Sequence, residues 1–200
     1  TSACEIAYNH LRDNPATYDA VYKSPRSQLS SGPNIMYDNA DNDLGNHLIG
    51  DLDVSIESLE ESAYLVKNYV EKYGQTPKNV EIGGVRLNMA QFLDLLTQEL
   101  VKIKNNDRSA LEVHDLNEPN DAQDDTHPGH ISRDAYLKIA EDTQNCINTH
   151  NRPPGYSDKS GLGKHLGFHN LVYAYSILFD KIRTEHKLPD YIDLNRTITK

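Results

Sequence analysis

The chain has 200 residues, of which 25% are charged, 37% hydrophobic and 8% aromatic, so it can form one ordinary domain or two small ones. Thirty acidic against 20 basic residues give a net charge of −10, which disfavours nucleic acid as a partner because phosphate contacts need clustered Lys and Arg. No stretch of the sequence approaches the roughly 20 apolar residues of a membrane-spanning helix, so membrane insertion is not expected.

Residues 1–55 are predicted to form an irregular N-terminal extension. Turn signals such as Asn14-Pro15 and the Asn- and Asp-rich run 38–43 recur there with little apolar periodicity between them. A short helix around Ala3–Leu11 is the one regular element expected in this part. The chain begins with Thr1 rather than Met, so we expect a processed product or a fragment of a longer protein.

Residues 56–104 are predicted to form a first unit of helix, turn, β-hairpin and helix. Apolar side chains recur every three or four residues from Leu59 to Tyr73, where Gly74 and a following proline end the helix. Two alternating runs then flank Gly83-Gly84, the signature of a tight hairpin. Asn88, with Gln three residues later, predicts a capping box for a second amphipathic helix.

Residues 105–130 are predicted to be an acidic linker, and residues 131–200 a second unit. The linker carries six acidic and no basic residues between positions 112 and 130, and we expect it to be solvated. In the second unit, a helix capped by Ser132 precedes a Gly- and Ser-rich connector, and a further helix stops at His186. The expected fold class is α+β, mainly α, with tandem helix–turn–β-hairpin–helix units behind the irregular extension.

Three of the predicted helix endings can be aligned on a shared proline. The prolines are Pro77, Pro154 and Pro189. An apolar residue stands seven positions before each proline, and Asn or Tyr stands two positions after it. A helix with one apolar stripe cannot bury that stripe alone, so this internal repeat predicts that the helices bury one another.

The last ending, Leu188-Pro189-Asp190-Tyr191-Ile192, resembles the pseudomurein-binding repeat, a module of archaeal wall-associated proteins. The segment 74–96 is similar to that repeat through Thr76-Pro77-Lys78-Asn79-Val80 and the Met89-Ala90-Gln91-Phe92 that follows. The resemblance covers about 59–103 and 132–194. It departs at Asn79, where Tyr is usual, and at Pro153-Pro154-Gly155, where a leucine before the proline is more typical.

The resemblance implies non-catalytic binding of pseudomurein, a cross-linked sugar–peptide polymer of the archaeal cell wall. The chain would act outside the cell, at the wall or cell surface, and would anchor a surface protein or a wall-acting enzyme. The alternative is a structural subunit of a surface layer, filament or virus particle, which would use the repeats for self-association.

The candidate ligand contacts are centred on Tyr156 and Tyr191, because tyrosine offers a planar ring and a hydroxyl together. The other members of the predicted ligand-binding set are Asn79, Arg152, Asp190 and Tyr175. Packing of the rings onto the preceding helix, and capping or solvent contact by the polar residues, are the structural alternatives at these positions.

No catalytic residue, metal site or cofactor is predicted. Cys146 lies inside a helix rather than at a helix N-terminus, where a thiolate is stabilised, and nothing fixes His114 relative to it. Any isopeptidase activity would therefore lie in a domain outside this chain. The run from Asp41 has Leu52 where a calcium loop needs Glu, and His127 and His130 lack partner ligands.

Two modifications remain open from the sequence. Cys4 and Cys146 would form a single bridge in an oxidising setting, or else are two unrelated buried thiols. Asn195-Arg196-Thr197 is an N-glycosylation sequon, which fits an exposed tail at a cell surface.

Overall fold

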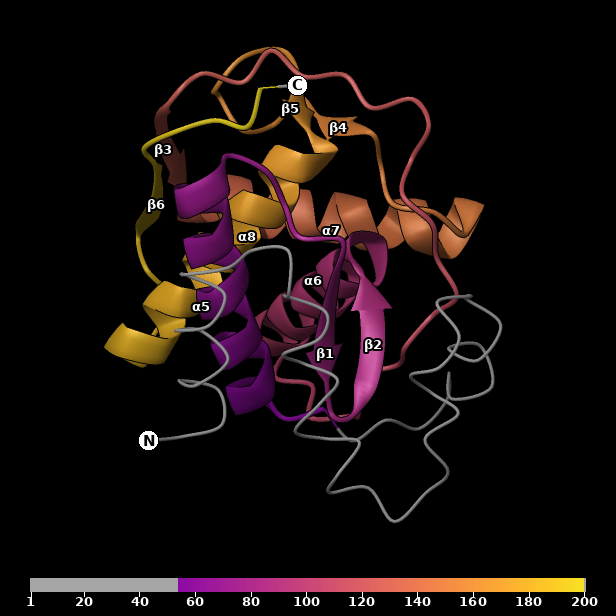
Figure 1. Ribbon diagram of the computed structural model, residues 1–200. Coiled ribbons are helices and arrows are strands. Elements are labelled where there is room, and N and C mark those ends of the chain that lie inside the picture. The colour runs from indigo at the N-terminus through magenta and orange to yellow at the C-terminus, as the bar shows by residue number, and fades with distance from the viewer. Residues whose placement is uncertain (1–53, 200) are drawn as a thin grey trace.

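The computed structural model describes residues 54–199 (Figure 1). About 49% of the protein it describes is helix and 14% is strand, which confirms the predicted α+β, mainly α class. The expected irregular extension, its short helix, Cys4 and the Asp41 turn all lie outside the described residues.

Four long helices form the body of the described chain, and all four were predicted. They are α5 (Ile56–Tyr73), α6 (Met89–Asn105), α7 (Arg133–His150) and α8 (Phe168–Glu185). Helix α5 packs mainly against α8, and α6 packs against both α7 and α8. The two predicted units therefore share one hydrophobic core, with residues such as Leu59, Phe92, Ile139, Leu171 and Phe179 in a single buried cluster.

Three small antiparallel sheets connect the helix ends. The hairpin pairs β1 (Asn79–Ile82) with β2 (Val85–Asn88). The Gly- and Ser-rich connector closes through β4 (Tyr156–Ser157) and β5 (Leu166–Gly167). The third pair, β3 (Gly129–Ser132) with β6 (Tyr191–Leu194), joins the two ends of the second predicted unit and was not foreseen.

The three aligned helix endings share one backbone geometry. Gly74, Asn151 and His186 are each in the left-handed conformation, and each N–H bonds the carbonyl four residues earlier. These carbonyls belong to the apolar residues that align seven positions before the prolines. The cap reverses the chain, and the proline three residues later directs it into a strand.

The local signals around the first hairpin are confirmed. Gly83 and Gly84 have φ values of 61° and 87°, which a tight two-residue hairpin turn requires and glycine adopts without strain. Asn88 caps α6 by accepting from the Gln91 N–H at 2.9 Å, and the Gln91 side chain accepts from the Asn88 N–H at 3.1 Å.

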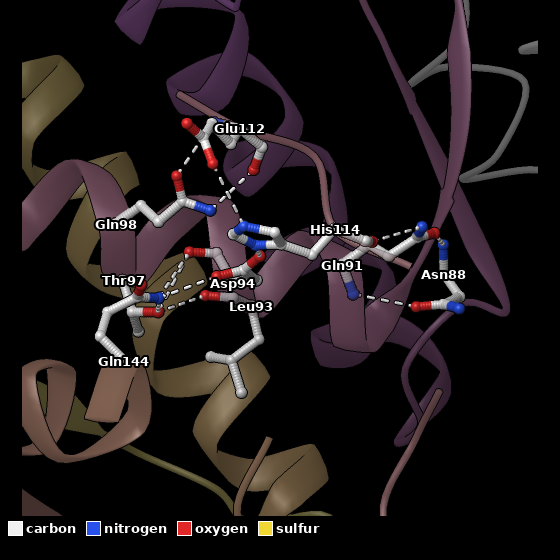
Figure 2. Close-up of polar contacts among 9 residues, drawn as sticks. All are labelled: Asn88, Gln91, Leu93, Asp94, Thr97, Gln98, Glu112, His114 and Gln144. Carbon is white, nitrogen blue, oxygen red and sulfur yellow. Dashed lines mark hydrogen bonds and ion pairs between the residues drawn. The ribbon is translucent and has the colours of Figure 1, made fainter. Parts of the chain in front are cut away.

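The segment 107–117, which we call the strap, is solvated at its acidic residues, as predicted, but its large apolar residues are not. Leu111, Val113 and Leu116 are buried in the common core. The strap runs along α6, and three amide side chains bond alternate strap carbonyls; Figure 2 shows the bonds to His114 and Glu112. These bonds run from Asn88 to Leu116, from Gln91 to His114 and from Gln98 to Glu112, at 2.7–3.0 Å.

The acidic residues that follow the strap are also held in place. A Cβ built on Gly167 would clash with the Asp124 carboxylate, and one built on Gly163 would clash with the Asp125 carboxylate. The Asn170 amide donates to Asp124 at 2.6 Å. This close approach explains why glycines border the β4–β5 loop, and it fixes the acidic segment against that loop.

We predict that Asn88→Ala lowers the free energy of unfolding by about 2 kcal/mol, because it removes both a helix cap and the bond to the Leu116 carbonyl. Urea denaturation measures the change. Asn148→Ala, at an exposed helix position, is the matched control and should be nearly neutral. Equal losses in the two variants would contradict the role given to Asn88.

Candidate functional site

Each strand pair brings the residue two positions after an aligned proline beside the start of another helix. Asn79 pairs with Asn88, Tyr156 with Gly167 and Tyr191 with Ser132. The three partners are the N-cap residues of α6, α8 and α7. The position two residues after each aligned proline therefore has the same backbone surroundings in all three places.

At the β3–β6 pair, Tyr191 forms a cluster with His130 and Asp193, which we call the Tyr191 cluster. The His130 ring stacks on the Tyr191 ring at 4.5 Å between centroids and 7° between planes. His130 Nε2 lies 2.8 Å from Asp193 Oδ1. The Lys181 ammonium lies 4.8 Å from the centre of the same tyrosine ring, a cation–π distance.

At the β4–β5 pair, Tyr156, His165 and Asp125 form the Tyr156 cluster. The Tyr156 and His165 rings meet edge to face at 4.5 Å. Asp125 accepts from the His165 N–H at 2.7 Å, and its second oxygen lies 3.4 Å from Nδ1 of that ring. The hydrogen bond from the His165 backbone N–H lowers the pKa of the Asp125 carboxyl, so this group stays ionised as a carboxylate.

The two clusters have the same register. In each, the histidine stands two residues before the N-cap that pairs with the tyrosine, so ring and imidazole meet diagonally across two strands. At the first hairpin the corresponding residues are Asn79 and Arg86. The Asn79 side-chain oxygen, with its amide oriented to satisfy both ends, accepts from the Arg86 guanidinium at 2.8 Å.

Tyr156 and Tyr191 are the large hydrophobic side chains that stand exposed in the described chain, at 39% and 43%. Each cluster thus offers solvent an aromatic ring, an imidazole and a carboxylate. An aromatic ring packs against apolar C–H surface, while imidazole and carboxylate bond hydroxyl and amide groups. This combination suits a sugar or peptide ligand, and we take the two clusters as the candidate functional site.

The polar members of the predicted ligand set make structural contacts. Arg152 donates to Asp121 Oδ1 at 2.8 Å, tying the end of α7 to the acidic segment. Asp190 is 89% exposed at its side chain and accepts from Arg133 at 2.6 Å. Arg133 also donates to the Leu188 and Pro189 carbonyls, so it fixes the turn that leads to Tyr191.

Tyr175 is not available to a ligand, and its predicted role as a contact is wrong for this structure. Its side chain is 2% exposed, and its hydroxyl donates to the Tyr136 carbonyl at 2.5 Å. The Tyr136 hydroxyl in turn donates to the Pro189 carbonyl at 2.5 Å. Burial raises the pKa of Tyr175 well above its usual value. The residue belongs to the core between α7 and α8.

The sites of the two predicted modifications are also visible. Cys146 is half-buried on α7, and burial raises the pKa of its thiol, which opposes the thiolate form that a nucleophile needs. Its predicted partner Cys4 lies outside the described residues. Asn195 is exposed just after β6, so its side chain is accessible.

A second polar centre, which sequence reasoning missed, joins the strap to α6 and α7 (Figure 2). Asp94 is fully buried, and its Oδ2 lies 2.6 Å from Nδ1 of His114. The Gln144 amide donates to Asp94 Oδ1 at 2.9 Å. Sequence spacing gave no signal for this centre, since its three residues lie on separate segments.

Within residues 54–199, no three His, Cys, Asp or Glu side chains come together in a way that could hold a metal ion. His127 bonds the Pro128 carbonyl and His130 belongs to the Tyr191 cluster. In the same part of the chain, none of the helices has the length and apolar character to cross a membrane.

Comparisons with models of protein families, with curated proteins and with solved structures found no match to this chain. The resemblance to the pseudomurein-binding repeat therefore stays a prediction from the residues that suggested it.

We predict that His114 makes stability depend on pH. The hydrogen bond to Asp94 raises the pKa of His114 above 6.5, so its stabilisation is complete below about pH 6.5 and is lost as pH rises through the raised value. The difference in unfolding free energy between the native chain and His114→Gln should therefore shrink as the pH rises above about 6.5. Urea denaturation across that range measures it.

His150→Ala is the control for this pH series, because His150 is exposed at the end of α7. Its difference from the native chain should stay small at every pH. A His114→Gln difference that is constant with pH would contradict the charged His114–Asp94 pair.

Proposed function

We propose that the chain is a non-catalytic binding module for pseudomurein, and that the Tyr156 and Tyr191 clusters contact the polymer. The observation that carries this proposal is that each of two strand pairs exposes a tyrosine whose ring meets the histidine two residues before the paired N-cap, with an aspartate beside that histidine. Core packing requires neither tyrosine to be exposed, so a role at the surface explains both.

The shared backbone supports reading the two clusters as copies of one module. The first N–H of α7 bonds the Asp190 carbonyl at 2.8 Å, and the first N–H of α8 bonds the Gly155 carbonyl at 3.0 Å. Each acceptor directly precedes the exposed tyrosine. We propose that the first hairpin, with Asn79 and Arg86, is a third copy whose ring has been replaced.

The spacing of the clusters favours a polymeric ligand. Tyr191 pairs with the residue that caps the start of α7, and Tyr156 follows its end. The helix has 18 residues, or about 27 Å at 1.5 Å per residue. A single exposed ring binds weakly, but two sites on one chain that meet the same polymer gain about 100-fold or more in avidity.

We expect the full chain to sediment with purified pseudomurein sacculi. Tyr156→Ala and Tyr191→Ala should each weaken this binding by about 100-fold, because each leaves a single site, and the double variant should not bind. A sacculus pull-down over a range of protein concentrations measures the change. Tyr73→Ala is the control, since Tyr73 is a partly exposed tyrosine on α5 outside both clusters.

Three outcomes would oppose the proposal. Undiminished binding by the double variant would remove the tyrosines from the site. Polymerisation of the chain without affinity for sacculi would favour the structural subunit of a layer, filament or particle. Release of free amines from wall peptides by the isolated chain would show that it is an enzyme. Thermal melting of each variant checks that its fold is intact.

A further inference from the structure

A groove separate from both tyrosine clusters lies between the strap, the C-terminal half of α6 and the outer face of α7. It encloses about 670 Å³, within the range of roughly 300–1,000 Å³ typical of small-ligand sites. Its lining includes Lys102, Ser109, Glu112, Lys138, Asn145 and Asn148. None of its lining residues belongs to the Tyr156 or Tyr191 cluster.

The floor of this groove is held rigidly by paired polar groups. The Gln98 side chain donates to the Glu112 carbonyl at 2.8 Å and accepts from the Glu112 N–H at 3.0 Å (Figure 2). Gln144 is bonded to buried Asp94 and to the Thr97 hydroxyl. These groups are satisfied within the protein, so they shape the groove and keep the strap at a fixed distance from α7.

The side-chain amides of Asn145 and Asn148 line the groove and are accessible to a ligand. Both are exposed and stand three residues apart on α7, so their side chains project from one face of the helix. Neither side chain has a hydrogen-bond partner among residues 54–199. A primary amide both donates and accepts, which complements the N–H and C=O of a peptide backbone.

Charged side chains of both signs surround the groove, and they form ion pairs with one another. Lys102 bonds Asp107 at 3.3 Å and Lys138 bonds Asp142 at 2.8 Å. Glu141 meets Lys104 at 2.6 Å. Partly exposed pairs of this kind contribute little stability, so a ligand group of the same charge can take the place of a protein partner at small cost. The lining includes no Tyr, Phe or Trp side chain, which disfavours a stacked sugar ring.

We propose that this groove is a binding site for a short peptide that carries one carboxylate and one ammonium group. Asn145 and Asn148 bond the peptide backbone, Lys138 meets the carboxylate, and Glu141 meets the ammonium group. This site does not depend on the polymer binding proposed for the tyrosine clusters.

The test is a titration of the isotope-labelled full chain with end-blocked tripeptides, followed by NMR. Asp-Ala-Lys should shift the side-chain amide signals of Asn145 and Asn148 in a saturable way. Asp-Ala-Asp and Lys-Ala-Lys, which each carry two charges of the same sign, should bind at least fivefold more weakly. The double variant Asn145→Ala/Asn148→Ala should bind Asp-Ala-Lys about 25-fold more weakly, because each substitution removes one hydrogen bond to the peptide. Thr149→Ala, on the same helix, is the control and should bind as tightly as the native chain.

The proposal is overturned if no saturable shift occurs, if the shifts fall on the tyrosine clusters, or if the double asparagine variant binds as well as the native chain. Both asparagines are exposed, and alanine is the better helix former, so a loss of fold does not confound the result; a melting curve confirms this. Failure of sacculus binding with retained peptide binding would remove the proposed function and leave this site standing.

Discussion

The backbone constraint at the helix endings determines where the candidate site lies. A left-handed residue closes each of three helices, and a proline three residues later commits the chain to a strand that pairs with the N-cap of a helix. This strand pairing joins the chain that leaves one helix to the residue that caps the start of another. It therefore gives hydrogen-bond partners to backbone groups at helix ends that would otherwise bond water. The residue two positions after each proline begins that strand, and at Tyr156 and Tyr191 this residue is exposed.

Local signals in the sequence were sufficient for the helices and for the first hairpin. Glycine at positive φ, the Asn88 capping box and the proline spacing each act within a few residues. The turns and helix ends that they form can therefore be predicted without knowledge of the fold. The β3–β6 pair could not be read in this way, since its strands lie about 60 residues apart and each has only four residues. The exposed tyrosines were predicted from the repeat, whereas their histidine partners depend on register across two strands.

The strap and Tyr175 show a different limit of sequence reasoning. Only three buried apolar residues hold the strap to the core. The rest of its anchoring comes from the amide side chains of the α6 N-cap, Asn88, and of Gln91 and Gln98 on α6, which the apolar pattern of the sequence does not reveal. Helix α8 is buried on nearly all sides from Phe168 to Phe179, where it packs against α5 and α6. Tyrosine on such a helix needs an internal acceptor for its hydroxyl, and the carbonyl of Tyr136 serves that need for Tyr175.

The pairing of β3 with β6 brings Gly129 opposite Leu194, so the segment between them begins and ends at neighbouring points in space. A segment with adjoining ends can be joined to other sequences through short connections on one side of the molecule. Because helices α7 and α8 of this segment share one core with α5 and α6, the closure does not create a separate body but holds both ends of the segment at one edge of that core.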